Sequence, residues 1–249
     1  MNFYNSDSID KLKGEVKKAP SGFNFGYANN LFKDEVYAEL IKTFPNVSKF
    51  KFVDKMSGGG HKRFYVGPVY TSGTHLGCVC HMENLPEIWK KVIQESASPE
   101  FMEMLSEASG VKFNSLCNFG FAYGNEGCRQ EAHIDGAVRE EEYGQHRSTI
   151  ALLLYFNEKE GGSSGTCVYG TDRKTVLFQA PGLRNSMAFF EQHTDAWHGF
   201  PTVPAGEDRR VISLSYSLEK DPIVLKTSWG HKLTCKRRLK DFAKKILKR

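Results

Sequence analysis

A series of short β-like segments between residues 111 and 218 is the feature that most constrains the fold of this chain. Each segment is rich in β-branched and aromatic residues, and turn-forming residues separate it from the next. The segments span residues 113–124, 148–157, 165–170, 174–180, 185–190 and 209–217. They do not alternate with helical segments, which argues against a doubly wound parallel sheet. The spacing therefore predicts a sandwich or barrel of short strands.

The first 110 residues have the pattern of helices that support such a core. In "YANNLFKDEVYAELIKTFP", apolar residues recur near helical spacing, with Asn29 or Asn30 as the N-cap and Pro45 as the stop. "LPEIWKKVIQES" and "SPEFMEMLSEASG" each have proline near the first helical turn. We therefore expect one domain over residues 1–249, with helical and strand support in 1–110, a β core in 111–218 and a tail in 219–249.

The tail is strongly basic, whereas the rest of the chain is mildly acidic. Of the net charge of +5, residues 226–249 contribute +9 and residues 1–225 contribute −4. A helix over the last residues would place one apolar stripe on a single side: Leu239, Phe242, Ala243, Ile246 and Leu247. Such an amphipathic helix either packs on the β core with its charges in water, or contacts an anionic surface such as acidic lipid headgroups or a phosphorylated substrate.

Localisation is predicted from what the sequence lacks. No apolar run has the length of about 18–20 residues that a membrane-spanning helix needs. The N-terminal segment has no apolar core of a secretory signal. The six cysteines form no recognisable disulfide framework or zinc motif in a chain of 249 residues. We expect a cytoplasmic protein with reduced thiols.

The tripeptide His133-Ile134-Asp135 is the first candidate for chemistry. On an extended backbone, side chains at i and i+2 point to the same face, so His133 and Asp135 can bind one metal ion together. The same pattern also occurs as an ordinary polar strand end. A non-haem Fe(II) site of the facial-triad type needs a second histidine from elsewhere in the chain. The candidates are His146, His193, His198 and His231.

Three longer stretches resemble the prolyl-4-hydroxylase-like Fe(II)/2-oxoglutarate dioxygenases. "AWHGFPTVPAGEDRRVISLSYS" is similar to the closing motif of that family, in which an apolar-Pro-Val segment, a glycine turn and a basic residue follow a histidine. "FAYGNEGCRQEAHID" resembles the approach to the first ligands, and "TIALLLYFNEKEGG" resembles the strand that follows. The matching residues occur in family order within residues 118–217: Tyr123, Gly127, His133, Asp135, Tyr155, Asn157, Gly161, Gly162, His198 and Arg209.

The resemblance implies a fold and a metal site. The fold would be mainly β with flanking helices: a double-stranded β-helix, also called a jelly roll or cupin-like fold, with N-terminal helical support. Within it, His133, Asp135 and His198 would hold Fe(II) and act as the catalytic centre. The implied co-substrates are 2-oxoglutarate and O₂, with ascorbate as a candidate reductant.

The resemblance also implies how 2-oxoglutarate is held. Arg209 would bind the far carboxylate, because a guanidinium can bind a carboxylate through two parallel hydrogen bonds. Arg210 is the alternative, and it lies on the opposite face of the last strand. Tyr155 matches a position that donates its hydroxyl to the same carboxylate, although it would serve equally as a core tyrosine.

Two segments are candidates for the substrate pocket. The segment "GAVREEEYGQHRS" follows the carboxylate ligand directly and contains Arg139, Tyr143 and Arg147, although it would equally be a solvated loop. The segment "HKRFYVGPVY" contains Arg63 and Tyr65 next to glycines that would let it move, although it would equally be an aromatic edge strand.

The function that follows is hydroxylation of an unactivated C–H bond, with 2-oxoglutarate converted to succinate and CO₂. We expect a small polar metabolite, a sugar or an amino-acid-type substrate, free or borne on a carrier. No nucleic-acid substrate is expected, because "RRVISLSYS" lacks the second arginine of the nucleic-acid demethylases. The alternatives are a peptidyl prolyl hydroxylase or oxygen sensor, a non-catalytic cupin-like binding module, and a surface-binding protein that works through its basic tail.

Overall fold

The computed structural model describes residues 3–49, 51–53, 61–67, 78–81, 85–135 and 148–218. Within these residues, the main sheet has nine strands in the order β1-β2-β11-β8-β13-β6-β4-β3, with β5 beside β4. Their bounds are β1 Lys17–Lys18, β2 Asn24–Asn29, β3 Lys51–Val53, β4 His61–Gly67, β5 Cys78–His81, β6 Ser115–Gly124, β8 Ser148–Phe156, β11 Arg184–Glu191 and β13 Arg209–Ser217. All six segments predicted to be β-like form strands, which confirms that part of the prediction.

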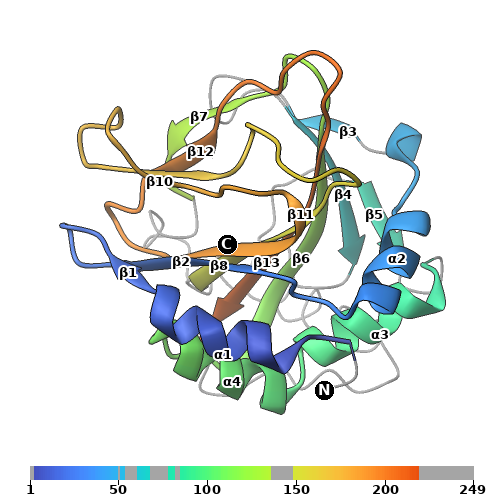
Figure 1. The fold of residues 1–249 in the computed structure, drawn as a ribbon, viewed down its shortest axis with the longest axis horizontal. Coiled ribbons are helices and arrows are strands. Elements are labelled where there is room, and N and C mark those ends of the chain that lie inside the picture. Colours follow the sequence, from blue (N-terminus) through green and yellow to red (C-terminus); the bar gives the residue numbers. More distant parts are fainter. Residues whose placement is uncertain are drawn as a thin grey trace, which may run out of the picture.

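A smaller sheet lies across from the main sheet. Its strands have the order β10-β9-β12-β7 among the described residues. Their bounds are β7 Gln130–His133, β9 Cys167–Tyr169, β10 Val176–Gln179 and β12 His198–Phe200. The strands pair antiparallel throughout, except for the parallel pair β4–β5. The two sheets therefore enclose a flattened barrel of antiparallel strands (Figure 1).

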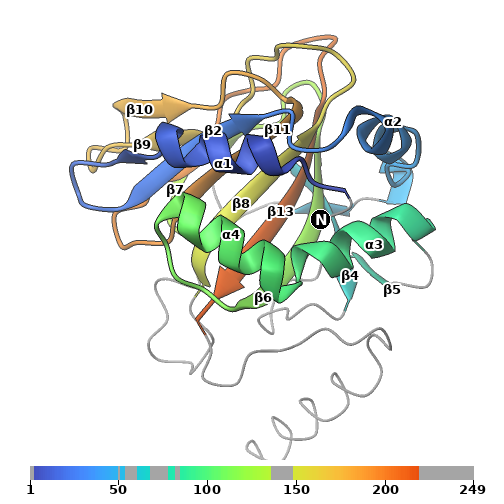
Figure 2. The ribbon, with the colours of Figure 1, turned by 60° about the horizontal axis from the view of Figure 1, so that its bottom comes forward.

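In the part of the chain that the structure describes, four α-helices cover the other face of the main sheet (Figure 1). They are α1 Ser6–Glu15, α2 Asp34–Lys42, α3 Glu87–Ser96 and α4 Pro99–Ser109, and a short 3-10 helix, η1, spans Val47–Lys49. Figure 2 shows α1 lying along α4. The Ser98 Oγ accepts a hydrogen bond from the Phe101 backbone N–H at 3.2 Å, and Pro99 occupies the first turn of α4, as proline at this position predicts. The predicted helices in 85–96 and 98–110 are thus confirmed.

Each central strand of the main sheet has two different faces. Side chains on the helix side are large and apolar and form one core with α1–α4: they include Phe119, Phe121, Leu152, Leu154, Met187, Phe189, Ile212 and Leu214. Side chains on the barrel side form a second, smaller cluster that includes Ala122, Tyr155, Ala188 and Val211. Successive residues of a strand point to opposite faces, so this division follows directly from the strand register.

The helix predicted to begin at Asn29 or Asn30 begins at Asp34 instead. Residues Asn24–Asn29 form β2, which pairs with β11, and Asn30 leaves the strand with a left-handed φ of 53°. Leu31 and Phe32 are buried in the connection. The prediction was wrong because pairing with β11 decides the conformation of this stretch, and sequence periodicity does not record that pairing.

Part of the sequence prediction falls outside the described residues. The basic tail from residue 219 onward and the loop 136–147 are in this group. Among the described helices, none combines the length and the apolar character that crossing a lipid bilayer would require.

Asn185 links β11 to the start of the helical layer, which gives a testable prediction. Its side chain is buried, its Oδ1 accepts a hydrogen bond from the Phe32 N–H, and its Nδ2 donates one to the Phe32 carbonyl, both at 2.9 Å. We expect Asn185→Ala to lower the free energy of unfolding by about 2–4 kcal/mol, because a buried donor and a buried acceptor lose their partners. Urea denaturation followed by circular dichroism measures this loss.

Two further variants test whether the lost hydrogen bonds of Asn185 cause this loss of stability. Asn185 has a left-handed φ of 46°, so Asn185→Gly keeps the backbone conformation and isolates the loss of the hydrogen bonds. Asn46 makes an exposed contact with Ser48, so Asn46→Ala is the matched control and should change stability by less than about 0.5 kcal/mol. Equal losses for Asn185→Ala and Asn46→Ala would contradict the assignment.

Candidate metal centre

Two histidines lie opposite each other on neighbouring strands of the smaller sheet. The ladder between β7 and β12 pairs His198 directly with His133. The centroids of the two imidazole rings are 4.2 Å apart. Directly opposed residues of an antiparallel pair have side chains in contact, so the strand register alone brings these rings together.

Asp135 completes the group from two residues beyond His133. Its Oδ1 lies 3.6 Å from the His133 Nε2 and 3.5 Å from the His198 Nε2. Each of the three residues offers a ligand atom, and these atoms all lie within 4.8 Å of one another. Among the described residues, this is the one cluster of His, Cys, Asp or Glu arranged to hold a metal ion.

Backbone carbonyls fix which imidazole nitrogen faces the cluster. The Nδ1 of His133 lies 3.0 Å from the Glu131 carbonyl, and the Nδ1 of His198 lies 3.0 Å from the Ala196 carbonyl. A carbonyl oxygen can only accept, so the hydrogen bonds assign the proton of the neutral ring to Nδ1 and leave the Nε2 lone pair facing the cluster, where that of His133 also accepts from the Gln130 amide Nε2 at 3.1 Å. This is the usual outer-shell arrangement of metal-binding histidines.

The charge states of the cluster also suit a cation. Burial, followed by the nearby His198, lowers the pKa of His133. Burial opposes the ionisation of Asp135, but the charges and hydrogen bonds of the two histidines outweigh it and hold the pKa of Asp135 well below its usual value. A neutral imidazole and an ionised carboxylate are the forms that bind metals. The lone pairs of the imidazoles and of the carboxylate point toward one position. A cation at that position would stabilise this arrangement.

Arg209 lies inside the same barrel and is almost fully buried, with 4% of its surface exposed. Its Nε donates a hydrogen bond to the Ser164 carbonyl at 2.9 Å, and its Nη2 donates one to the Thr166 Oγ1 at 2.8 Å. Tyr155, on the neighbouring strand β8, donates its hydroxyl to the same Thr166 oxygen at 2.6 Å. The structure thus brings Arg209 and Tyr155 together through Thr166.

The position of the Arg209 guanidinium relative to the metal cluster follows from β12. The guanidinium carbon lies 4.1 Å from the centroid of the Phe200 ring. His198 and Phe200 are two residues apart on one strand and share a face, which separates them by about 7 Å along the strand. Nearby, the Ser164 Oγ is buried and has no hydrogen-bond partner among the described residues.

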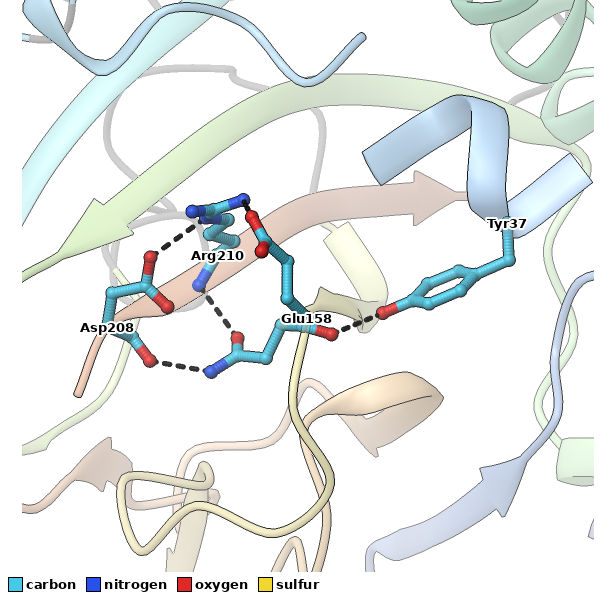
Figure 3. Close-up of polar contacts among 5 residues, drawn as sticks. Tyr37, Glu158, Asp208 and Arg210 are labelled. Carbon is cyan, nitrogen blue, oxygen red and sulfur yellow. Dashed lines mark hydrogen bonds and ion pairs between the residues drawn. The ribbon is translucent and has the colours of Figure 1, made fainter. Parts of the chain in front are cut away.

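Arg210 points to the opposite face of β13 (Figure 3). Its Nε forms an ion pair with Asp208 at 2.9 Å, and its Nη1 forms one with Glu158 at 2.7 Å. Its backbone N–H donates to the Asn157 Oδ1, and the Asn157 carbonyl accepts from the Tyr37 hydroxyl of α2 at 2.7 Å. This network ties the first residues of β13 to α2 and to the end of β8, with Arg210 on the helix side of the sheet.

Of the remaining candidate histidines and the substrate residues of loop 136–147, the structure describes one, His193. His193 packs its ring against Phe23, at 6.0 Å between centroids, and the other two candidate histidines, in the loop and in the tail, are outside the described residues. Arg139, Tyr143 and Arg147 are also outside them.

Arg63 and Tyr65 lie in β4, opposite Ala122 and Gly120 of β6, and the structure does not describe their side chains. The sequence reasoning missed Ser164, Thr166 and Gln192. No local pattern in the sequence marks these residues, and Gln192 lies just past the end of β11 at Glu191.

Gly199, between the second histidine and Phe200, gives a prediction for this centre. A Cβ at Gly199 would lie 2.4 Å from the Gln130 carbonyl oxygen and 2.9 Å from that of Glu131. Gly199→Ala should therefore push β12 away from β7, separate the two histidines and weaken Mn(II) binding about tenfold or more. Electron paramagnetic resonance of free Mn(II) during a titration measures the dissociation constant.

The control is Gly14→Ala in α1, where an added Cβ meets nothing within 4 Å. This variant should leave Mn(II) binding unchanged and be as stable as the parent or more so, by up to about 1 kcal/mol. Unaltered Mn(II) affinity in Gly199→Ala would show that the spacing of β7 and β12 does not control the centre.

Comparison with known proteins finds similarity in structure. No protein-family model matches the chain, and no curated protein matches it in sequence. A prolyl hydroxylase from Trichoplax adhaerens, in complex with a peptide fragment of the hypoxia inducible factor oxygen degradation domain, superposes with a TM-score of 0.58 at 16% identity, over 86% of this chain and 90% of that chain. A prolyl-4-hydroxylase from Pseudomonas putida gives 0.54 at 11% identity, over 86% and 98%.

A third similar structure is that of an enzyme named for a different reaction. The non-haem α-ketoglutarate-dependent epimerase SnoN from nogalamycin biosynthesis gives a TM-score of 0.55 at 9% identity, over 86% of this chain and 84% of that chain. These similarities confirm the predicted double-stranded β-helix. The chain has the fold of the prolyl-4-hydroxylases and other Fe(II)/2-oxoglutarate oxygenases.

Proposed function

We propose that this chain is an Fe(II)- and 2-oxoglutarate-dependent dioxygenase that hydroxylates a C–H bond of a small polar metabolite, sugar or amino-acid-type substrate. One observation carries the proposal: the Nε2 atoms of His133 and His198 and the Oδ1 of Asp135 converge within one barrel. Two histidines and one carboxylate on one side of a metal form the donor set of the facial triad. These three residues would hold a metal from one side and leave its other side for a co-substrate.

The residues present fit Fe(II). Both histidines offer Nε2 lone pairs whose orientation is fixed by backbone carbonyls, and Asp135 supplies the anionic oxygen. When bound, iron supplies the oxidation chemistry that couples conversion of 2-oxoglutarate and O₂ into succinate and CO₂ to substrate hydroxylation. The protein holds and orients the groups that react.

Arg209 is the residue that we propose binds the far carboxylate of 2-oxoglutarate. It faces the barrel interior, it is buried, and a guanidinium pairs with a carboxylate in bidentate fashion. The strand distance of about 7 Å between His198 and Phe200, where the guanidinium lies, suits a short dicarboxylic acid that reaches from the metal to Arg209. The buried Ser164 hydroxyl is an additional donor that we assign to this carboxylate, and the Tyr155 hydroxyl joins it by turning its proton from the Thr166 Oγ1 to the bound carboxylate.

Apolar side chains of the barrel wall lie beside Arg209, whose surface is 4% exposed. Ala122, Ala180, Leu183 and Val211 form the apolar cluster around Tyr155. Low local polarity strengthens the attraction between a guanidinium and a carboxylate, because water does not compete with it. The interior face of the main sheet therefore favours binding of a charged co-substrate at one fixed cation.

The similar structures suggest two classes of substrate. The similar structures include a prolyl hydroxylase with a bound peptide fragment and an epimerase of nogalamycin biosynthesis, so the fold suits both peptides and small molecules. We assign substrate contacts to Arg139, Tyr143 and Arg147, which follow Asp135 in the sequence, and to Arg63 and Tyr65 of β4, the strand that pairs with β6. Prolyl hydroxylation of a peptide is the second candidate, and the Trichoplax adhaerens complex is the observation that favours it.

Turnover without substrate tests the proposal directly. The purified protein, given Fe(II), O₂, 2-oxoglutarate and ascorbate as the two-electron reductant that takes the place of the substrate, should form succinate slowly, and His133→Ala should abolish this because the metal loses a ligand. Succinate quantified by mass spectrometry is the measurement. His193→Ala is the matched control and should retain the rate of the parent protein, since His193 packs on Phe23. Tight 2-oxoglutarate binding without any turnover would favour a non-catalytic binding module instead.

A second experiment separates the two arginines. We expect Arg209→Lys to raise the KM for 2-oxoglutarate about 10- to 100-fold, since a charge-assisted hydrogen bond contributes about 1.5–3 kcal/mol. Arg210→Lys is the matched change on the opposite face, and it should keep the KM within about twofold while it lowers stability by about 1 kcal/mol. A larger rise in KM for Arg210→Lys would reverse the assignment.

A further inference from the structure

Gln192 contacts the carboxylate ligand from a different strand. It follows β11 directly, and its Nε2 donates a hydrogen bond to the Asp135 Oδ2 at 2.7 Å. The other oxygen of the same carboxylate, Oδ1, is the one that faces the two histidines, at 3.5 and 3.6 Å. The two oxygens of Asp135 are thus divided between the metal cluster and Gln192.

The backbone of Gln192 is fixed independently of this contact. Its N–H donates to the Thr149 carbonyl at 2.9 Å, which continues the ladder between β11 and β8 by one residue. Phe190 lies two residues earlier on the same face, and its ring packs on that of His198 at 4.2 Å between centroids. One face of the end of β11 therefore contacts two of the three cluster residues.

Asp135 has less support of its own than the histidines have. β7 ends at His133, so Asp135 lies beyond the ladder that pairs β7 with β12. Apart from the two histidines, Gln192 is the side chain that contacts its carboxylate among the described residues. The direction of the carboxylate consequently depends on the Gln192 amide.

The orientation of this amide leaves an acceptor unsatisfied. The Gln192 Oε1 is buried and has no hydrogen-bond partner among the described residues. An ionised carboxylate only accepts hydrogen bonds, so the NH₂ group must face Asp135 and the carbonyl oxygen must face away. A buried acceptor without a hydrogen-bond partner destabilises the folded protein. We therefore look for a role of Gln192 other than stabilising the fold.

We propose that Gln192 is a positioning residue that holds Asp135 so that a single oxygen binds the metal. With Oδ2 engaged by the amide, the carboxylate binds through Oδ1 alone and leaves more coordination positions open. Without the amide, Asp135 can rotate and present both oxygens or neither. This inference rests on the proposed function and assigns a residue that supports the same metal centre.

The test replaces the amide with an apolar side chain of similar length, Gln192→Met. The dissociation constant for Mn(II) should rise about 10- to 100-fold, as for other outer-shell substitutions. The absorption spectrum of the Co(II)-loaded protein should also change, because its band positions and intensities report the number and geometry of the ligands. Melting of the metal-free protein should remain within a few degrees of the parent, since the variant also loses the unsatisfied Oε1.

Gln94→Met in α3 is the matched control, with the same change in a half-buried glutamine of the helical layer. It should leave the Mn(II) affinity and the Co(II) spectrum unaltered. If Gln192→Met binds Mn(II) like the parent, or if its loss of affinity accompanies a collapse of the metal-free fold, the positioning role is refuted and the proposed function stands. If the parent protein binds no Mn(II), the proposed function and this inference are both refuted.

Discussion

The register of a three-residue strand against its neighbour is the constraint on which the rest of the centre depends. β12 pairs with β7 so that His198 opposes His133, and the close packing at Gly199 leaves no space for another register that keeps the same strand spacing. A shift by one residue would turn one imidazole to the other face of the sheet. The two Nε2 atoms that face Asp135 therefore owe their proximity to backbone pairing, and the carbonyl contacts of Glu131 and Ala196 set the orientation of the rings.

Successive side chains of a strand point to opposite faces, and this alternation explains how one sheet supports both a core and a site. The central strands β6, β8, β11 and β13 present large apolar side chains to α1–α4 and smaller or polar side chains to the barrel. Arg209 and Arg210 show the consequence within one dipeptide. The first is enclosed by Thr166, Ser164 and Phe200, whereas the second forms ion pairs beside α2.

Much of the fold and part of the site could be predicted from the sequence, and the exceptions have a common cause. The short strands, the helices after Pro86 and Ser98, and the placement of Arg209 and Arg210 on opposite faces all depend on local patterns, which a sequence records directly. The start of α2 was wrong because β2 is a strand only through its pairing with β11. Gln192 and Ser164 were missed for the same reason: their roles arise from contacts with residues 57 and 45 positions away, and nothing in their own neighbourhood marks them.

The separation of the two faces has a consequence for how this protein can diverge. Helix-side residues of a strand pack in the core with α1–α4, and barrel-side residues of the same strand belong to a separate cluster in the barrel interior. Substitutions well apart and without shared partners have nearly additive effects. The barrel interior can accordingly acquire new side chains, whether by natural drift or in a directed library at alternate positions of β6, β8 and β13, while the folding free energy contributed by the opposite face is largely preserved.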